Sequence, residues 1–208
     1  MKLLLGLAVA SVAGVAVVGF SAPADLPELA GSVVKLTDKT GHGSGVHIGG
    51  GYVLTAAHVP GSKKAMAYVR DDGKRGQAKV IWASPEYDVA LMKLDAAEGL
   101  AASNLECRAP GKGETVLLEG NPLILEGITT WGRIAGGETS LGPWASVLPV
   151  DASIAGGMSG GGAFDVEGDL IGINVGAMVQ SLGLGGTYVG LSLIVPGSTI
   201  CGLLARDE

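Results

Sequence analysis

Short apolar runs recur along this 208-residue chain, each rich in Val, Ile, Leu or Tyr and bounded by glycine or charged residues. Runs of this length and composition are typical of β-strands, and little of the chain has a helical period. In the first half, the pattern predicts strands over 32–36, 45–54, 65–70, 78–83 and 89–94.

A second group of runs follows a small, polar segment over 96–113, which we interpret as a connector between two halves. The strands predicted there are 114–119, 128–134, 145–150, 162–164, 170–174 and 187–195. About six short strands on each side of a connector favour two small antiparallel barrels. A short helix over 198–206 is expected to end the chain, with Ser198 as its N-cap.

The first residues have another pattern. Lys2 is followed by an uncharged apolar run over 3–20 and by the small-residue site Ala22-Pro23-Ala24, as in a secretory signal peptide. The run is longer than the ~7–15 residues usual for a cleaved signal. We expect cleavage near Ala24 and an exported protein, periplasmic or secreted, and an uncleaved anchor holding the chain to a membrane through residues 3–20 is the alternative.

Composition narrows the choice of partners. The formal net charge of −6 and scattered basic residues leave no electrostatic footprint for nucleic acid. The 36 glycines follow no collagen period and suit tight turns between strands. Cys107 and Cys201 form one disulfide or remain two buried thiols, and neither has a metal-ligand pattern around it.

Three segments carry candidate chemistry: TAAHV at 55–59, EYDVAL at 86–91 and GGMSGG at 156–161. They supply His58, Asp88 and Ser159 in that order. A serine hydroxyl becomes a strong nucleophile when an imidazole takes its proton and a carboxylate holds that imidazole in one tautomer. The order His, Asp, Ser is one of three recognised orders and is the one used on paired β-barrels. The segments predict a serine peptidase that needs no cofactor.

Flanking sequences extend the pattern. They are GSGV at 43–46, YVLTAAHV at 52–59, YDVALMKL at 87–94, EGNPL at 119–123, GMSGGGAF at 157–164, LIGIN at 170–174 and GLSLIVP at 190–196. With these, the chain over roughly 32–204 resembles the trypsin/chymotrypsin superfamily of serine peptidases. The resemblance is to its HtrA-type and bacterial or phage trypsin-like branch, here without room for a PDZ domain. It implies two antiparallel six-stranded Greek-key β-barrels, over 25–105 and 106–197, before a helix at 198–208.

The resemblance assigns roles to single residues. Ser159 is the expected nucleophile, His58 the general base and later acid, and Asp88 the residue that orients His58. The amides of Gly157 and Ser159 are expected to form the oxyanion hole, for which glycines permit the tight turn. Met158 stands where digestive enzymes carry an aspartate that pairs with a new N-terminus, so activation by N-terminal cleavage is not expected. His42 and His47 lack such a frame and receive no role.

The expected substrate pocket has Ser153, six residues before the nucleophile, at its base. Its walls are Val175, Gly176, Ala177, Gly190, Leu191 and Ser192. Because no carboxylate occupies the base, we expect cleavage after small or medium apolar residues, although Asp151 lies only two positions away. Val175 offers no hydroxyl that would help to hold Asp88.

Three functions are compatible with these features. The first is an active, exported endopeptidase acting on polypeptides. The second is a binding or structural module that keeps the peptidase fold with a collapsed oxyanion loop. Met158 in that loop is the residue that suggests this alternative. The third is a processing enzyme of narrow specificity, tethered through residues 3–20. Substrate identity and oligomeric state are beyond the reach of the sequence.

Overall fold

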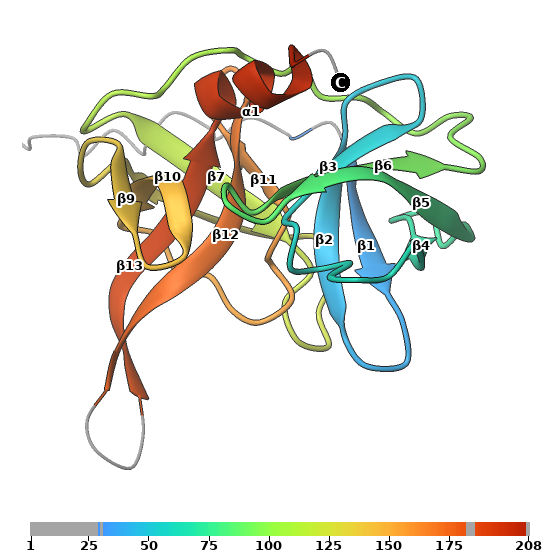
Figure 1. The fold of residues 1–208 in the computed structure, drawn as a ribbon, viewed down its shortest axis with the longest axis horizontal. Coiled ribbons are helices and arrows are strands. Elements are labelled where there is room, and N and C mark those ends of the chain that lie inside the picture. The colour runs from blue at the N-terminus through green and yellow to red at the C-terminus, as the bar shows by residue number, and fades with distance from the viewer. Residues whose placement is uncertain (1–28, 30, 182–185, 207–208) are drawn as a thin grey trace, which may run out of the picture.

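The first half of the chain closes into a six-stranded barrel (Figure 1), in a computed structural model that describes residues 29, 31–181 and 186–206. Its antiparallel strands follow the order β1-β2-β3-β6-β5-β4. They are β1 (Val33–Thr37), β2 (His42–His47), β3 (Tyr52–Thr55), β4 (Ala65–Val69), β5 (Arg75–Ser84) and β6 (Val89–Leu94). The predicted signal or anchor over 1–24 lies outside the described residues.

The second half forms a seven-stranded antiparallel sheet in the order β8-β7-β11-β12-β13-β10-β9. A bridge between Ile134 and Val150 also brings the end of β8 to β10. The strands are β7 (Thr115–Gly120), β8 (Ile128–Arg133), β9 (Thr139–Leu141), β10 (Trp144–Val150), β11 (Gly162–Phe164), β12 (Leu170–Ser181) and β13 (Gly186–Pro196). The expected all-β fold is confirmed. The second half has one strand more than the six that the sequence predicted, because β9 adds a short hairpin partner to β10.

Two local predictions were wrong. The single strand expected over 45–54 is two strands, because Gly49, Gly50 and Gly51 all adopt positive φ and turn the chain back. The last helix, α1 (Gly197–Leu204), begins one residue earlier than expected, with Pro196 and not Ser198 at its N-cap. The Ser198 amide donates to the Arg108 carbonyl of the connector instead.

One of the hydrophobic clusters is shared by both halves. The largest cluster of buried side chains contains Val46 and Leu54 from the first barrel and Leu117, Phe164 and Val195 from the second sheet. Burial of apolar surface is the main force that holds such a unit together. The two halves are therefore packed against each other, and residues at the seam can act as one site. No helix among the described residues is both long and apolar enough to cross a membrane.

A disulfide ties the connector to α1. Cys107 and Cys201 are bonded, with their Cα atoms 5.6 Å apart and 94 positions apart in sequence. Beside the disulfide, the Arg108 guanidinium lies 2.6 Å from Glu114 and 2.8 Å from Asp165. The covalent link and the ion pairs together fasten the segment between the halves to the end of the chain.

Candidate active site

His58 and Asp88 meet at one end of the first barrel. Thr55 and Ala90 lie opposite each other in the pairing of β3 with β6, so the turns that carry the two residues are adjacent. The His58 Nδ1 atom donates to Asp88 Oδ2 at 2.7 Å, and the His58 backbone amide donates to Oδ1 at 2.9 Å. This pairing holds the imidazole with Nδ1 protonated and leaves Nε2 free for a substrate-side reaction.

Asp88 is held tightly in this position. It is only 7% exposed, and its φ of 55° is in the left-handed region, which aspartate tolerates better than most residues. A further donor, the indole Nε1 of Trp144, lies 3.0 Å from Oδ2. Nothing in the sequence around Trp144 pointed to this contact, because β10 comes to Asp88 only through the packing of the two halves.

Ser159 is carried by the loop between β10 and β11. The Ser159 carbonyl accepts the Ser44 amide at 2.8 Å, and the Gly160 amide donates to the Asn174 carbonyl at 2.7 Å, so both barrels hold the loop. Ser159, Gly157 and His58 line one cavity of about 340 Å³. Within the described part of the chain, no hydrogen bond joins the Ser159 hydroxyl to His58. Contacts of this kind are often long before substrate binds.

The loop before Ser159 is held by a backbone hydrogen bond. The Gly156 carbonyl accepts the amide of Leu123 at 2.8 Å. Because a trans peptide is planar, the Gly157 N–H then points to the opposite side. Neither this amide nor that of Ser159 donates to a backbone carbonyl of the residues described. Both therefore remain candidates for the expected oxyanion hole.

The buried side chain of Met158 anchors the same loop. Its side chain is 1% exposed and packs in the core of the second half with Val116, Leu118 and Ala163. The Met158 amide donates to the Ala155 carbonyl, which closes a tight turn before Ser159. Apolar burial thus holds this loop, where the sequence had left its conformation open.

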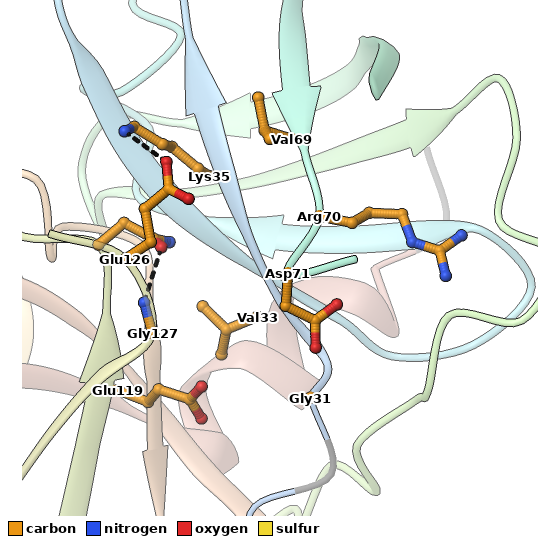
Figure 2. A pocket seen from close by; sticks show the side chains of 10 residues that line it. Gly31, Val33, Lys35, Val69, Arg70, Asp71, Glu119, Glu126 and Gly127 are labelled. Atoms are coloured by element: carbon orange, nitrogen blue, oxygen red, sulfur yellow. Dashed lines mark hydrogen bonds and ion pairs between the residues drawn. The ribbon is translucent and has the colours of Figure 1, made fainter. Parts of the chain in front are cut away.

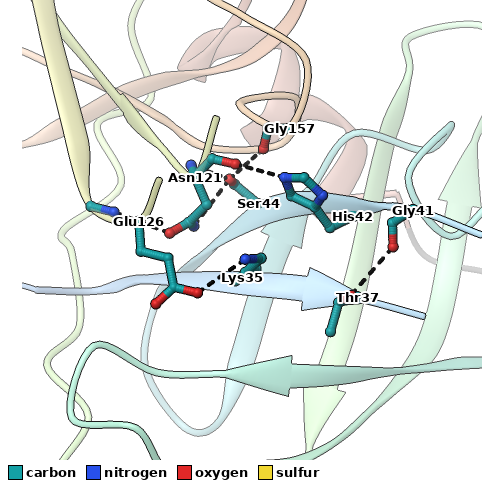
Figure 3. Close-up of polar contacts among 9 residues, drawn as sticks. Lys35, Thr37, Gly41, His42, Ser44, Asn121, Glu126 and Gly157 are labelled. Atoms are coloured by element: carbon teal, nitrogen blue, oxygen red, sulfur yellow. Dashed lines mark hydrogen bonds and ion pairs between the residues drawn. The ribbon is translucent and has the colours of Figure 1, made fainter. Parts of the chain in front are cut away.

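A polar network joins the loop to the first barrel (Figure 3). The Ser44 hydroxyl donates to the Gly157 carbonyl at 2.8 Å and accepts the Asn121 amide at 2.9 Å. His42 Nε2 donates to the Asn121 carbonyl at 2.9 Å. These partners come from β2 and the end of β7, so sequence reasoning, which gave His42 no role, could not pair them. His47 is different: it is buried, donating to Ala101 and accepting from Gly51.

The expected substrate pocket is brought together only in part. Val175, Gly176 and Ala177 line a mostly apolar groove of about 560 Å³ that also includes His58 and Trp144. Gly190 is exposed and Leu191 half-buried on β13, and neither lines that groove.

Two serines of that pocket have other partners. Ser192 is fully buried, its hydroxyl donates to the Ala152 carbonyl, and it does not line the groove. Ser153 is exposed and its carbonyl accepts the Thr130 hydroxyl at 2.7 Å. The nearby Asp151 carboxylate accepts the Arg133 amide.

A second cavity, of about 190 Å³, lies between the halves (Figure 2). Glu119 and Asp71 point into it, and Glu126 pairs with Lys35 at its edge at 3.0 Å. Glu119 is 9% exposed and its Oε2 has no hydrogen-bond partner in the described structure. Burial, with a smaller contribution from Asp71, raises the pKa of Glu119 to about 7. Among the described residues, no three acidic, His or Cys side chains are arranged to hold a metal ion.

Comparisons with known proteins agree with this geometry. The family described as trypsin-like peptidase domain matches residues 43–173. A probable periplasmic serine endoprotease, DegP-like, of Brucella suis is 36% identical over 153 residues, 72% of this chain and 29% of that protein. The periplasmic serine endoprotease DegP of Salmonella typhimurium is 29% identical over 170 residues, 79% of this chain and 35% of that protein.

Solved structures give the same result. An HtrA-type protease, AlgW with a tripeptide, superimposes with a TM-score of 0.73 at 28% identity, covering 85% of this chain and 60% of that one. The serine endoprotease from Yersinia pestis gives 0.72 at 27% identity, covering 85% and 62%. This chain spans about a third of the curated relatives' length. With the family match extending over most of the barrels, the chain belongs to the trypsin-like peptidase domain family.

Proposed function

We propose that this protein is an exported serine endopeptidase in which Ser159 is the nucleophile, His58 the general base and Asp88 the orienting carboxylate. The observation that carries the proposal is the hydrogen bond between His58 and Asp88, together with the cavity that His58 and Ser159 line. The amides of Gly157 and Ser159 have no backbone acceptor among the described residues. We propose that they stabilise the oxyanion that forms when Ser159 attacks a carbonyl carbon.

The reaction has two halves. The Ser159 Oγ attacks the scissile carbonyl carbon while its proton passes to His58 Nε2. The oxyanion accepts hydrogen bonds from the Gly157 and Ser159 amides, and His58 then gives the proton to the leaving amine, which forms the acyl-enzyme. Water, deprotonated by His58, attacks the ester and releases the acid and the free Ser159. Asp88 remains a carboxylate throughout.

The substrate is a polypeptide, which we propose is cut after small or medium apolar residues. The wall formed by Val175, Gly176 and Ala177 is apolar. Among the described residues, Asp88 is the one carboxylate that lines the groove, and it is already bonded to His58 and Trp144. The relatives named periplasmic support an exported location. A digest of a peptide library in which cleavage follows mainly Lys or Arg would overturn this specificity.

Labelling with a fluorophosphonate probe tests the activity itself. We expect the wild type to be labelled and to hydrolyse an unfolded protein, and Ser159→Ala to do neither. Ser62→Ala, which changes an exposed serine that does not itself line either cavity, is the matched control and should behave as the wild type. A folded wild type that is neither labelled nor active would favour the binding-module alternative.

A further inference from the structure

The carboxylate of Asp88 receives three protein donors, and one of them is neither part of the triad nor expected. Oδ2 accepts both His58 Nδ1 at 2.7 Å and the Trp144 indole Nε1 at 3.0 Å. Oδ1 accepts the His58 backbone amide at 2.9 Å. With Asp88 7% exposed, such charge-assisted contacts are stronger than the same bonds in water.

Trp144 is held in place by several independent contacts. It is the first residue of β10 and lies opposite Leu141 in the β9–β10 hairpin. The Ser140 hydroxyl donates to the Trp144 carbonyl at 3.1 Å. The next amide, of Ala145, donates at 3.0 Å to the carbonyl of Glu86, in the turn that carries Asp88. The β9–β10 hairpin is thus hydrogen-bonded to the turn that carries Asp88, the residue that its indole contacts.

Gly176 makes room for the indole ring. A Cβ at this position of β12 would lie 2.9 Å from Trp144 Cη2 and 3.0 Å from Cζ2, which is closer than packed atoms approach. A larger residue would therefore displace the ring from Asp88. The neighbouring Val175 has no polar side-chain atom and cannot donate to Asp88. Among the described residues, Trp144 is the one side chain other than His58 that donates to the Asp88 carboxylate.

We propose that Trp144 is a positioning residue for peptide hydrolysis. Its indole N–H fixes the rotation of the Asp88 carboxylate and stabilises its negative charge, so that His58 keeps Nε2 directed at Ser159. The proposal rests on the peptidase function proposed above. Because Trp144 also lines the apolar groove beside His58, it must be distinguished from a wall that only contacts substrate.

The variant Trp144→Phe removes the N–H and keeps an aromatic ring in the groove. A hydrogen bond to a charged group is worth enough that we expect kcat to fall about tenfold, with KM changed by less than about twofold. The acidic limb of the pH–rate profile should move to higher pH, since a carboxylate with fewer donors attracts a protonated imidazole more strongly. Trp131→Phe, on an exposed indole of β8, should change neither.

A second replacement keeps the proposal testable if Phe disturbs folding. Benzothienylalanine at position 144 has the shape of tryptophan with sulfur in place of N–H, and should reproduce the loss in kcat. Wild-type kcat and pH profile in either folded variant, or an effect confined to KM, would overturn the proposal and leave Trp144 as a groove wall. An inactive wild type would instead overturn the proposed function, and this inference with it.

Discussion

The amide of Leu123 donates to the carbonyl of Gly156 at 2.8 Å, and this hydrogen bond orients the peptide between Gly156 and Gly157, whose amide we propose for the oxyanion hole. Leu123 itself has a φ of 53°, in the left-handed region that bulky residues rarely adopt. The direction of the Gly157 amide therefore depends on the β7–β8 connection, far away in sequence.

Gly157→Ala should abolish most activity. Gly157 has a φ of 102°, and a Cβ there would collide with the Asn121 carbonyl and the His42 ring, so the loop must move. Losing one oxyanion donor costs on the order of 10²–10³ in rate, and kcat on a peptide substrate should fall by about that factor. The neighbouring Gly156→Ala is the control: its Cβ would meet nothing within 4 Å, and activity should be retained. Equal activity in the two variants would contradict the assigned oxyanion hole.

Met158→Ala should destabilise the protein. The side chain is 1% exposed within the core of the second half, and removing a buried Met side chain costs about 2–5 kcal/mol of unfolding free energy. Met158→Leu, of similar volume, should cost less than about 1.5 kcal/mol. Urea unfolding of both variants measures the difference. If Met158→Ala unfolded at the wild-type urea concentration, the loop would have another anchor.

The stability of the protein should fall as pH rises from about 5 to 8. The pKa of Glu119 is about 7 in the folded state against an ordinary value near 4.5, so between these values the folded chain binds the proton more tightly. The stabilisation is complete below the unfolded pKa and is lost as pH rises through the folded one, by about 1–3 kcal/mol in all.

Glu119→Gln should flatten this part of the pH–stability curve, measured by thermal unfolding at a series of pH values. Glu126→Gln is the matched control, because Glu126 lies at the edge of the same cavity, paired with Lys35 and half exposed. An unchanged slope in Glu119→Gln would mean that other groups cause the pH dependence.

Removing the disulfide should weaken the fold and spare the chemistry. Cys107 and Cys201 close a loop of 94 positions, and loss of a native disulfide costs about 2–5 kcal/mol. Replacing both cysteines with alanine should lower the melting temperature by an amount that corresponds to this loss of unfolding free energy. The kcat measured at low temperature should be unchanged. A reducing agent should destabilise the wild type only. If it lowered the melting temperature of the double variant equally, the disulfide would not be the cause.

The sequence predicted the residues and strands that local motifs specify. His58, Asp88 and Ser159 each sit in a short motif, and β6 and β11 were placed because apolar runs bounded by turns are read directly. The support of the site was not predictable in this way. Trp144, Ser44 and Leu123 act through contacts between distant segments, and no local pattern says which donor will meet which acceptor once the two halves pack.

Ser44 makes the candidate site depend on both halves of the molecule. Its fully buried hydroxyl belongs to the first barrel yet holds the Gly157 carbonyl of the second. Neither half alone can thus complete the site that contains the nucleophile. The hydrogen bonds around the loop that carries Ser159 are therefore complete only when both halves are folded and packed against each other.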